Sequence, residues 1–525
     1  MAKARGSGRT EPAADRSVAV GTDLVRGGLW TALSALVGVP LAAITNIALA
    51  RSLDVAGIGR WGQLVITWSI VGAVVNTGVS AASVQWIAQA RGRGDAAAVS
   101  QAIRTCAGYH IVLQGPILAV GIAVLLRGAP LPVIAAAAVA TLLEQALGTS
   151  SVILSGTARN ARAAQLGLVV GLVRAPLTIG LALMSSDAEI VWALVQTLGV
   201  VSIWLCYRSL TPDERSSVLM FRGSRPWPQG FAKYARNVGL AQLAGMLVFG
   251  RSELLVLSAY GQAHAAGYFT IATGIAALIT VPMDSLMAPL APAAAYYTGV
   301  SRERAGEMLL RALTLTGVLS GATAAAAPTL IAVALPWLYG DKFTPATAAA
   351  QVLAGLSLLQ SAIGSMATFA IAAHRTGQML TLSVFCAVFD VGIAAALVPV
   401  WGLSAAVLAS CVAQGLHLVL AAHIAAGATL TSRRAILLRM MPLLLGLMIG
   451  MGAAALCHLV NLDGWATAGL ALAAFGLFRL CLAVHPPLRI PTTEWDRLFA
   501  AAGPRLSRVG ILARGVLGAT TVPSA

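Results

Sequence analysis

Residues 377–424 read GQMLTLSVFCAVFDVGIAAALVPVWGLSAAVLASCVAQGLHLVLAAHI, and Asp390 is the only Asp, Glu, Lys or Arg among them. A helix rises about 1.5 Å per residue, so about 20 apolar residues cross the roughly 30 Å hydrocarbon core of a bilayer. The stretch is long enough for two crossings, which we predict at 377–399 and 401–424.

The same pattern recurs along the chain from Gly28 to Val484, with short polar joints that carry arginine. The chain is 58% hydrophobic and 10% charged, with a mean hydropathy of +0.82, whereas a soluble domain is about 25% charged. Only lipid can solvate this much apolar surface, so we predict an all-α, polytopic membrane protein with about 14 transmembrane helices. The predicted spans are 28–50, 61–89, 103–127, 131–156, 164–184, 188–207, 235–258, 267–295, 311–338, 345–373, 377–399, 401–424, 438–459 and 464–484.

We attribute the formal net charge of +16 to the placement of basic residues on one side of the membrane, and not to nucleic-acid binding. Arginine gathers in alternate joints and in both tails, which is the pattern of the cytoplasmic side. The opposite joints carry only Arg51, Arg60, Arg127 and Lys342. We therefore expect a multi-pass protein of the inner (plasma) membrane with both termini in the cytoplasm, in contact with anionic lipids.

A faint internal repeat divides the helices into two sets of six. Ala56-Gly57-Ile58-Gly59-Arg60-Trp61 opens the second predicted helix, and Ala265-Ala266-Gly267-Tyr268-Phe269 opens the eighth. Such a repeat favours two parallel lobes related by an axis along the membrane normal. The predicted organisation is a cytoplasmic tail at 1–27, an N-lobe at 28–207, a cytoplasmic linker at 208–234, a C-lobe at 235–424, two added helices at 438–484 and a cytoplasmic tail at 485–525.

The sequence contains no motif for nucleotide hydrolysis, for hydrolytic catalysis or for metal binding. None of the three lysines follows a glycine, so no P-loop exists, and neither HExxH nor GxSxG occurs. The six cysteines form no CxxC pair, and the seven histidines have no ligand spacing. We predict no cofactor, no metal and no catalytic residue, and a transport process that runs on an ion gradient, on membrane potential or on the gradient of the cargo.

Three segments resemble a known family. The first runs from Leu24-Val25-Arg26-Gly27-Gly28-Leu29-Trp30 to Gly57-Ile58-Gly59-Arg60-Trp61, the second contains Phe249-Gly250-Arg251-Ser252-Glu253, and the third contains Gly340-Asp341-Lys342-Phe343 and Trp401-Gly402-Leu403-Ser404. They are similar to polysaccharide flippases (Wzx-type) of the multidrug/oligosaccharidyl-lipid/polysaccharide (MOP) exporter superfamily. The resemblance implies two six-helix lobes around a central cavity, often with two added C-terminal helices, and alternating access.

The same resemblance implies a cargo of lipid-linked oligosaccharide, usually on an undecaprenyl diphosphate carrier, for surface polysaccharide assembly. Expected partners are a polysaccharide polymerase or glycosyltransferases, and we expect a monomer. One alternative is a MATE-like, cation-coupled antiporter of drugs or metabolites. A membrane glycan polymerase is a further alternative, which the short outer joints disfavour because such enzymes need a large outer loop.

Ionisable residues at membrane depth are costly and usually face a cavity or a partner. The cavity candidates are Arg174, Arg251, Glu253, Asp390, Glu144 and Asp284. Arginine could hold a diphosphate through bidentate hydrogen bonds, and Arg174 could instead neutralise Asp390, which lies at the equivalent place in the other lobe. Candidates for the mouths of the cavity are Arg26, Arg51 and Arg60.

Overall fold

A computed structural model describes residues 30, 34, 37–157, 159–220, 230–249, 252–287, 290, 294, 297–298, 301–460, 462 and 464–485, and these residues form helices with no strand among them. The first set comprises a shorter apolar helix, Val37–Ser52, followed by α2 (Val55–Asn76), α3 (Val79–Gly92), α4 (Ala96–Tyr109), a π-helix (His110–Gln114), α5 (Gly115–Leu125), α6 (Leu131–Gly156), α7 (Asn160–Met184), α8 (Ala188–Arg208) and α9 (Pro212–Leu219).

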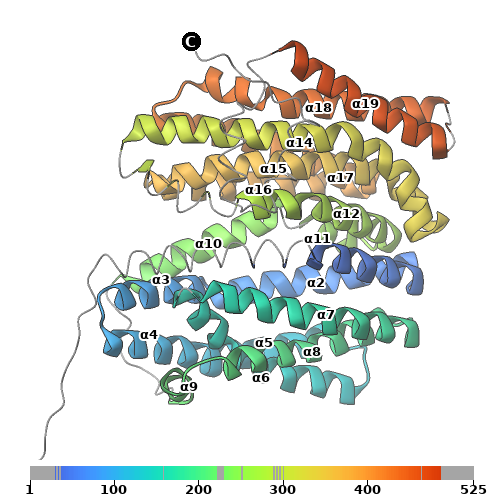
Figure 1. The fold of residues 1–525 in the computed structure, drawn as a ribbon. Helices are drawn as coiled ribbons and strands as arrows, with labels where there is room; N and C mark the ends of the chain where they lie inside the picture. The colour runs from blue at the N-terminus through green and yellow to red at the C-terminus, as the bar shows by residue number, and fades with distance from the viewer. Residues whose placement is uncertain are drawn as a thin grey trace, which may run out of the picture.

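The second set begins at residue 231. It comprises α10 (Phe231–Phe249), α11 (Ser252–Ala259), α12 (Ala263–Met287), α14 (Arg302–Tyr339), a 3-10 helix (Asp341–Ala346), α15 (Thr347–Ala372), α16 (Thr376–Trp401), α17 (Leu403–Thr429), α18 (Arg433–Val460) and α19 (Gly464–Val484). The two sets form two bundles, with α2–α9 in the lower half of Figure 1, α14–α19 in the upper half, and α10, α11 and α12 between them.

The membrane prediction is confirmed. Within the described residues, 12 helices are long and apolar enough to cross a bilayer, or up to 13 if α10 and α11 form one bent span. The first predicted span, 28–50, lies partly outside the described residues, and its described part is the helix Val37–Ser52. The all-α, polytopic fold follows from an apolar composition that leaves the backbone polar groups no other way of being satisfied in lipid.

Several predicted spans are interrupted. The span predicted at 61–89 begins earlier, because Asp54 caps α2 by accepting a hydrogen bond from the Gly57 amide. It breaks at Thr77 and Gly78, which both have a positive φ, so α2 and α3 are separate helices. The span predicted at 235–258 bends by 60° between α10 and α11. A joint between the bundles, predicted at 208–234, contains the short helix α9 and the beginning of α10.

The last two helices lie against the second bundle. α18 packs along α14, and α19 packs against both α14 and α18. Gly446 and Gly450 of α18 allow this contact, because a Cβ at either residue would approach a backbone oxygen of α14 to about 2.0 Å (Gly321 O) or 1.9 Å (Ala324 O). The helices α18 and α19 form a layer on the side of the C-lobe that lies away from α2 (Figure 1).

Candidate functional site at the seam between the lobes

The two lobes meet along one seam, which α2 and α3 form on one side and α10, α11 and α12 on the other. At one end the helix backbones nearly touch. A Cβ at Gly267 of α12 would lie 2.0 Å from the Val55 carbonyl oxygen of α2, and a Cβ at Gly59 would lie 2.6 Å from the Ala263 carbonyl oxygen. Only glycine permits this approach, since no ordinary side chain fits at these distances.

These glycines belong to the two motifs that mark the sequence repeat. Gly59-Arg60-Trp61 and Gly267-Tyr268-Phe269 open α2 and α12, and in the folded chain they lie against each other. A second close contact lies further along the seam, where a Cβ at Gly78 would be 2.6 Å from the Gly239 backbone nitrogen of α10. The lobes therefore touch at two levels.

A cavity of about 530 Å³ lies beside the first of these contacts. Its polar and aromatic lining is contributed by Asn46, Trp61, Ser69, Thr270 and Tyr339, and apolar residues of α2 and α12 supply most of the rest. Within the described part of the chain, no Asp, Glu, Lys or Arg lines it. The cavity therefore offers a ligand aromatic faces, an amide and two hydroxyl oxygens as acceptors, since Ser69 and Thr270 donate their own protons to backbone carbonyls, and its described lining carries no fixed charge.

Arg51, one of the predicted mouth residues, holds the two lobes together. Its guanidinium donates hydrogen bonds to the Leu338 carbonyl oxygen (Nε, 2.8 Å) and to the Trp337 carbonyl oxygen (NH2 nitrogen, 2.8 Å), both at the C-terminal end of α14. Lys342 makes the reverse connection, donating from Nζ to the Leu53 carbonyl oxygen at 2.7 Å. Cations are favoured at a helix C-terminus, so the pair forms a latch at this end of the seam.

Arg60, the other described mouth candidate, is paired inside the N-lobe. It forms an ion pair with Glu189 at 2.6 Å and donates to Gln63 Oε1 at 2.9 Å. This ion pair joins the beginning of α2 to the beginning of α8. Arg26, the candidate for the other mouth, lies outside the described residues.

Arg174 and Glu144 interact electrostatically within the N-lobe. Their charges interact, but at more than the 4.0 Å of an ion pair. The Glu144 carboxylate lies beside α8, where a Cβ at Gly199 would be 3.4 Å from Oε1. Neither residue lines the cavity at the seam.

The sequence left open two roles for Arg174, and one of them was to neutralise Asp390. In the structure, Arg174 does not lie against Asp390. Asp390 of α16 is fully buried in the C-lobe and accepts a hydrogen bond from Ser252 Oγ at 2.8 Å. Glu253 of α11, also buried, lies beside it and accepts a short hydrogen bond from Ser410 Oγ of α17. The lobes contribute separate charged pairs, and neither pair crosses the seam.

The proximity of two buried carboxyl groups has a chemical consequence. Two carboxylates cannot both be ionised at contact distance in a low-dielectric interior, so the Glu253–Asp390 pair retains a proton or holds a cation. Asp390 Oδ1 receives no hydrogen bond from any other described residue, so a proton shared with Glu253 is the donor that the pair itself can supply. No cluster of three or more His, Cys, Asp or Glu residues occurs in the part of the chain that the structure describes.

Two further cavity candidates complete the set. Asp284 lies near the end of α12 with an exposed side chain and does not line the seam cavity. Arg251 lies outside the described residues.

Sequence reasoning missed a polar cluster in the N-lobe. His110 is buried, with Nδ1 at 3.1 Å from Thr149 Oγ1 and Nε2 at 3.2 Å from Ser80 Oγ, and Asn76 Nδ2 donates to the same Ser80 oxygen at 2.8 Å. The cluster joins the break between α2 and α3 to the π-helix that starts at His110. Its only signal in the sequence was a histidine inside an apolar span.

Comparison with known proteins gives matches at the level of the fold. No protein-family model matches the sequence, and no curated protein sequence matches it. Among solved structures, the inward-facing conformation of a multidrug resistance MATE family transporter of the MOP superfamily matches with a TM-score of 0.55 and 16% identity, over 76% of this chain and 99% of that chain.

Two other structures give the same result. The eukaryotic MATE transporter AtDTX14 matches with a TM-score of 0.56 and 13% identity, over 81% of this chain and 99% of that chain. An outward-facing MATE family transporter matches with a TM-score of 0.53 and 18% identity, over 77% of this chain and 97% of that chain. The chain is thus a multi-pass membrane protein with the fold that is found in MATE transporters.

Proposed function

We propose that the protein is an alternating-access transporter that moves a lipid-linked oligosaccharide across the membrane. The observation that carries this proposal is the seam cavity, which combines two aromatic side chains, Trp61 and Tyr339, with the amide of Asn46 and the hydroxyl groups of Ser69 and Thr270. Aromatic faces and neutral donors and acceptors suit a sugar, because it presents C–H faces and many hydroxyl groups.

Two helices beyond the two lobes support a cargo with a lipid tail. α18 and α19 cover α14 and add apolar surface to the C-lobe, with Met448, Leu472 and Leu480 exposed. A lipid anchor remains in the hydrocarbon while its head group passes between the lobes, so such a transporter benefits from additional lipid-facing surface.

The absence of fixed charge from the described cavity lining limits what this cavity binds. A diphosphate would be left there without a cationic partner, at a high cost in a low-dielectric site. We therefore assign the sugar, and not the diphosphate, to the seam cavity. Arg174 remains a candidate for the phosphate groups within the N-lobe.

In this proposal the buried carboxyl pair, Glu253 and Asp390, is the coupling element. Protonation of Glu253 and Asp390 lets both stay in the interior, whereas loss of the proton favours a state in which water or a cation reaches them. Asp390 and Ser410 lie on α16 and α17, and Glu253 lies on α11, just after the bend between α10 and α11. Because α11 is one of the seam helices, a change in the protonation of the pair acts on the seam.

A second candidate is a MATE-like antiporter of drugs or metabolites. It is favoured by the resemblance to MATE structures and by an uncharged, partly aromatic cavity, which also suits an apolar organic compound. Both candidates need the same cavity and differ in its occupant.

The test uses purified protein in liposomes and two cargoes, a fluorescent lipid-diphosphate oligosaccharide and a cationic dye. Gly274→Phe fills the cavity, because the nearest atom to a Cβ there is Asn46 Nδ2 at 3.9 Å, and Gly469→Phe, at an exposed position of α19 where a Cβ meets open space, is the matched control. We expect flipping of the oligosaccharide to fall at least tenfold in Gly274→Phe and to be unchanged in Gly469→Phe. Dye transport without oligosaccharide flipping would establish the antiporter, and equal activity of the two variants would remove the cavity from the mechanism.

A further inference from the structure

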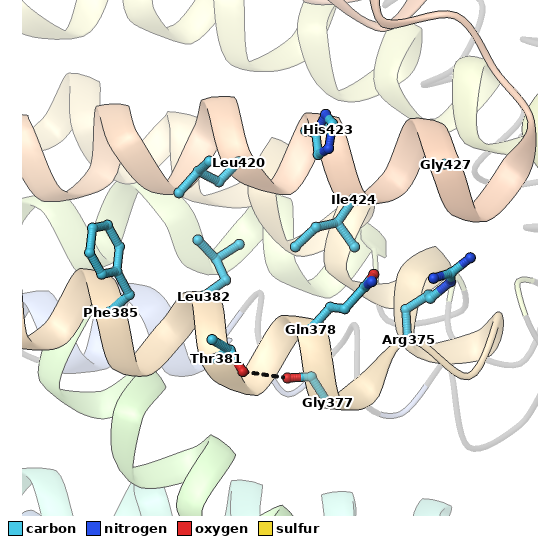
Figure 2. Close-up of a pocket in the computed structure, with 10 residues that line it drawn as sticks. All are labelled: Arg375, Gly377, Gln378, Thr381, Leu382, Phe385, Leu420, His423, Ile424 and Gly427. Carbon is cyan, nitrogen blue, oxygen red and sulfur yellow. Dashed lines mark hydrogen bonds between the residues drawn. The ribbon is translucent and has the colours of Figure 1, made fainter.

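A second cavity is a groove outside the seam, between α16 and α17. It has a volume of about 790 Å³ and is lined by Arg375, Gly377, Gln378, Thr381, Leu382, Phe385, Leu420, His423, Ile424 and Gly427. Figure 2 shows Leu382 and Ile424 pointing into the space between the two helices, with Arg375 and Gly427 at one end and Phe385 and Leu420 at the other. One end of the groove is therefore polar and basic, and the rest is apolar.

The apolar part faces the surroundings of the protein. Val384, Val388 and Phe389 of α16 and Val419 of α17 are exposed beside the groove. A continuous apolar surface on membrane-spanning helices is stable only in contact with hydrocarbon. The groove consequently opens to the bilayer and not to water.

The side chains at the basic end of the groove are available to bind an anion. In the part of the chain that the structure describes, neither the Arg375 guanidinium nor the His423 ring has a hydrogen-bond or ion-pair partner. Arg375 is also the N-cap of α16 and its side chain makes no cap, so the first amides of this 26-residue helix have no capping side chain among the described residues. Unpaired amides at a helix N-terminus beside a guanidinium favour a phosphate group.

The length of the groove matches one leaflet. Arg375 and Phe385 are ten residues apart on a helix, which corresponds to about 15 Å along its axis. That is half of the roughly 30 Å hydrocarbon core. Arg375 lies in a joint that the arginine distribution places on the cytoplasmic side, where anionic lipids are concentrated.

We propose that this groove binds one anionic phospholipid of the arginine-rich side, with the phosphate at Arg375 and the α16 N-terminus and an acyl chain along Leu382, Ile424 and Phe385. This site goes beyond the proposed function, because its occupant is a resident lipid and not the transported molecule. The lipid would brace α16 against α17, the two helices that carry Asp390 and Ser410.

The test measures lipid binding to delipidated, purified protein by native mass spectrometry, with phosphatidylglycerol and phosphatidylcholine as probes. We expect a preference for phosphatidylglycerol that weakens about fivefold in Arg375→Gln, the effect of one arginine at an anionic interface. Arg304→Gln, an exposed arginine at the beginning of α14, is the control and should leave binding unchanged.

A second pair of variants tests the groove itself. Gly427→Phe places a ring in the groove, where a Cβ meets open space, and Gly415→Phe does the same on α17 away from the lining. We expect Gly427→Phe to abolish the preferred binding and Gly415→Phe to retain it. Equal affinity for phosphatidylcholine, normal binding by Gly427→Phe, or occupation by a polyprenyl phosphate that excludes phosphatidylglycerol would each overturn the proposal.

Discussion

Gly267→Ala should separate the lobes at the end of the seam that Arg51 latches. The new Cβ would lie 2.0 Å from the Val55 carbonyl oxygen, whereas ordinary contact begins at 3.4 Å. The helices α2 and α12 must therefore move apart by about 1.4 Å, or the closed seam must bear an overpacking cost of about 1–3 kcal/mol. Because the neighbouring atom belongs to backbone, it cannot move aside as a flexible side chain would.

Gly274→Ala is the matched control on the same helix. Its Cβ would be 3.9 Å from the nearest atom, Asn46 Nδ2, so it adds no clash. Both substitutions raise the helix propensity of α12 by about 1 kcal/mol, and this gain is common to every conformation of the seam. The difference between the two variants therefore isolates the contact with Val55.

The measurement is the distance distribution between spin labels on the two lobes, at Ser186→Cys and His264→Cys, in a background without reactive native cysteines. Both positions are exposed and lie next to the helix beginnings at this end. A cost of about 1–3 kcal/mol shifts the ratio of separated to closed seam by roughly 5- to 150-fold. If Gly267→Ala and Gly274→Ala give the same distribution, the glycine contact does not control the seam and the reasoning is refuted.

Three further outcomes follow from the described contacts. Arg51→Gln should open the same end about fivefold, because it removes hydrogen bonds to a helix C-terminus that contribute about 1 kcal/mol at an exposed site, and the same labels measure it. Asp390→Asn should keep cargo binding but remove the stimulation of transport by a pH gradient, since it removes one carboxyl of the pair and with it the like charge that makes Glu253 and Asp390 retain a proton; stimulation equal to that of the unmodified protein would exclude the pair as the coupling site. Burial acts to raise the pKa of Glu214, but hydrogen bonds from Arg159 and Thr211 outweigh it and lower the pKa. The resulting stability is present above pH 4.5 and is lost as the pH falls through the lowered pKa, so melting temperatures should show a smaller acid-induced decrease in Arg159→Gln than in the unmodified protein.

The sequence predicts helices best where polar or helix-ending residues stand on both sides of an apolar run. The spans 131–156 and 464–484 agree with α6 and α19 at both ends. Hydropathy alone does not detect a break inside an apolar run, which is why 61–89 was predicted as one helix. The local signal was Thr77-Gly78, because glycine adopts a positive φ without steric cost and a β-branched residue lowers helix propensity.

For the candidate site, the residue types were predictable but their pairing was not. The sequence singles out Glu253, Asp390, Arg174 and Glu144 because charges at membrane depth are rare and costly. It cannot show that Glu253 and Asp390 meet, since they are far apart in the chain and lie on helices brought together by packing within the C-lobe. The His110 cluster was missed for the same reason, because its partners come from different helices.

The predicted internal repeat marks one pair of residues that meet in the structure and one pair that do not. Equivalent residues of two lobes related by an axis lie on opposite sides of that axis, so they meet only if they are close to it. Gly59 and Gly267, from the two motifs of the predicted repeat, pack against each other across the seam. Arg174 and Asp390, which the sequence predicts at equivalent places, each lie within their own lobe, where Arg174 interacts with the charge of Glu144 and Asp390 lies beside Glu253. Matching positions in a repeat therefore indicate similar environments, and they predict contact only where small residues let the two lobes approach along the axis.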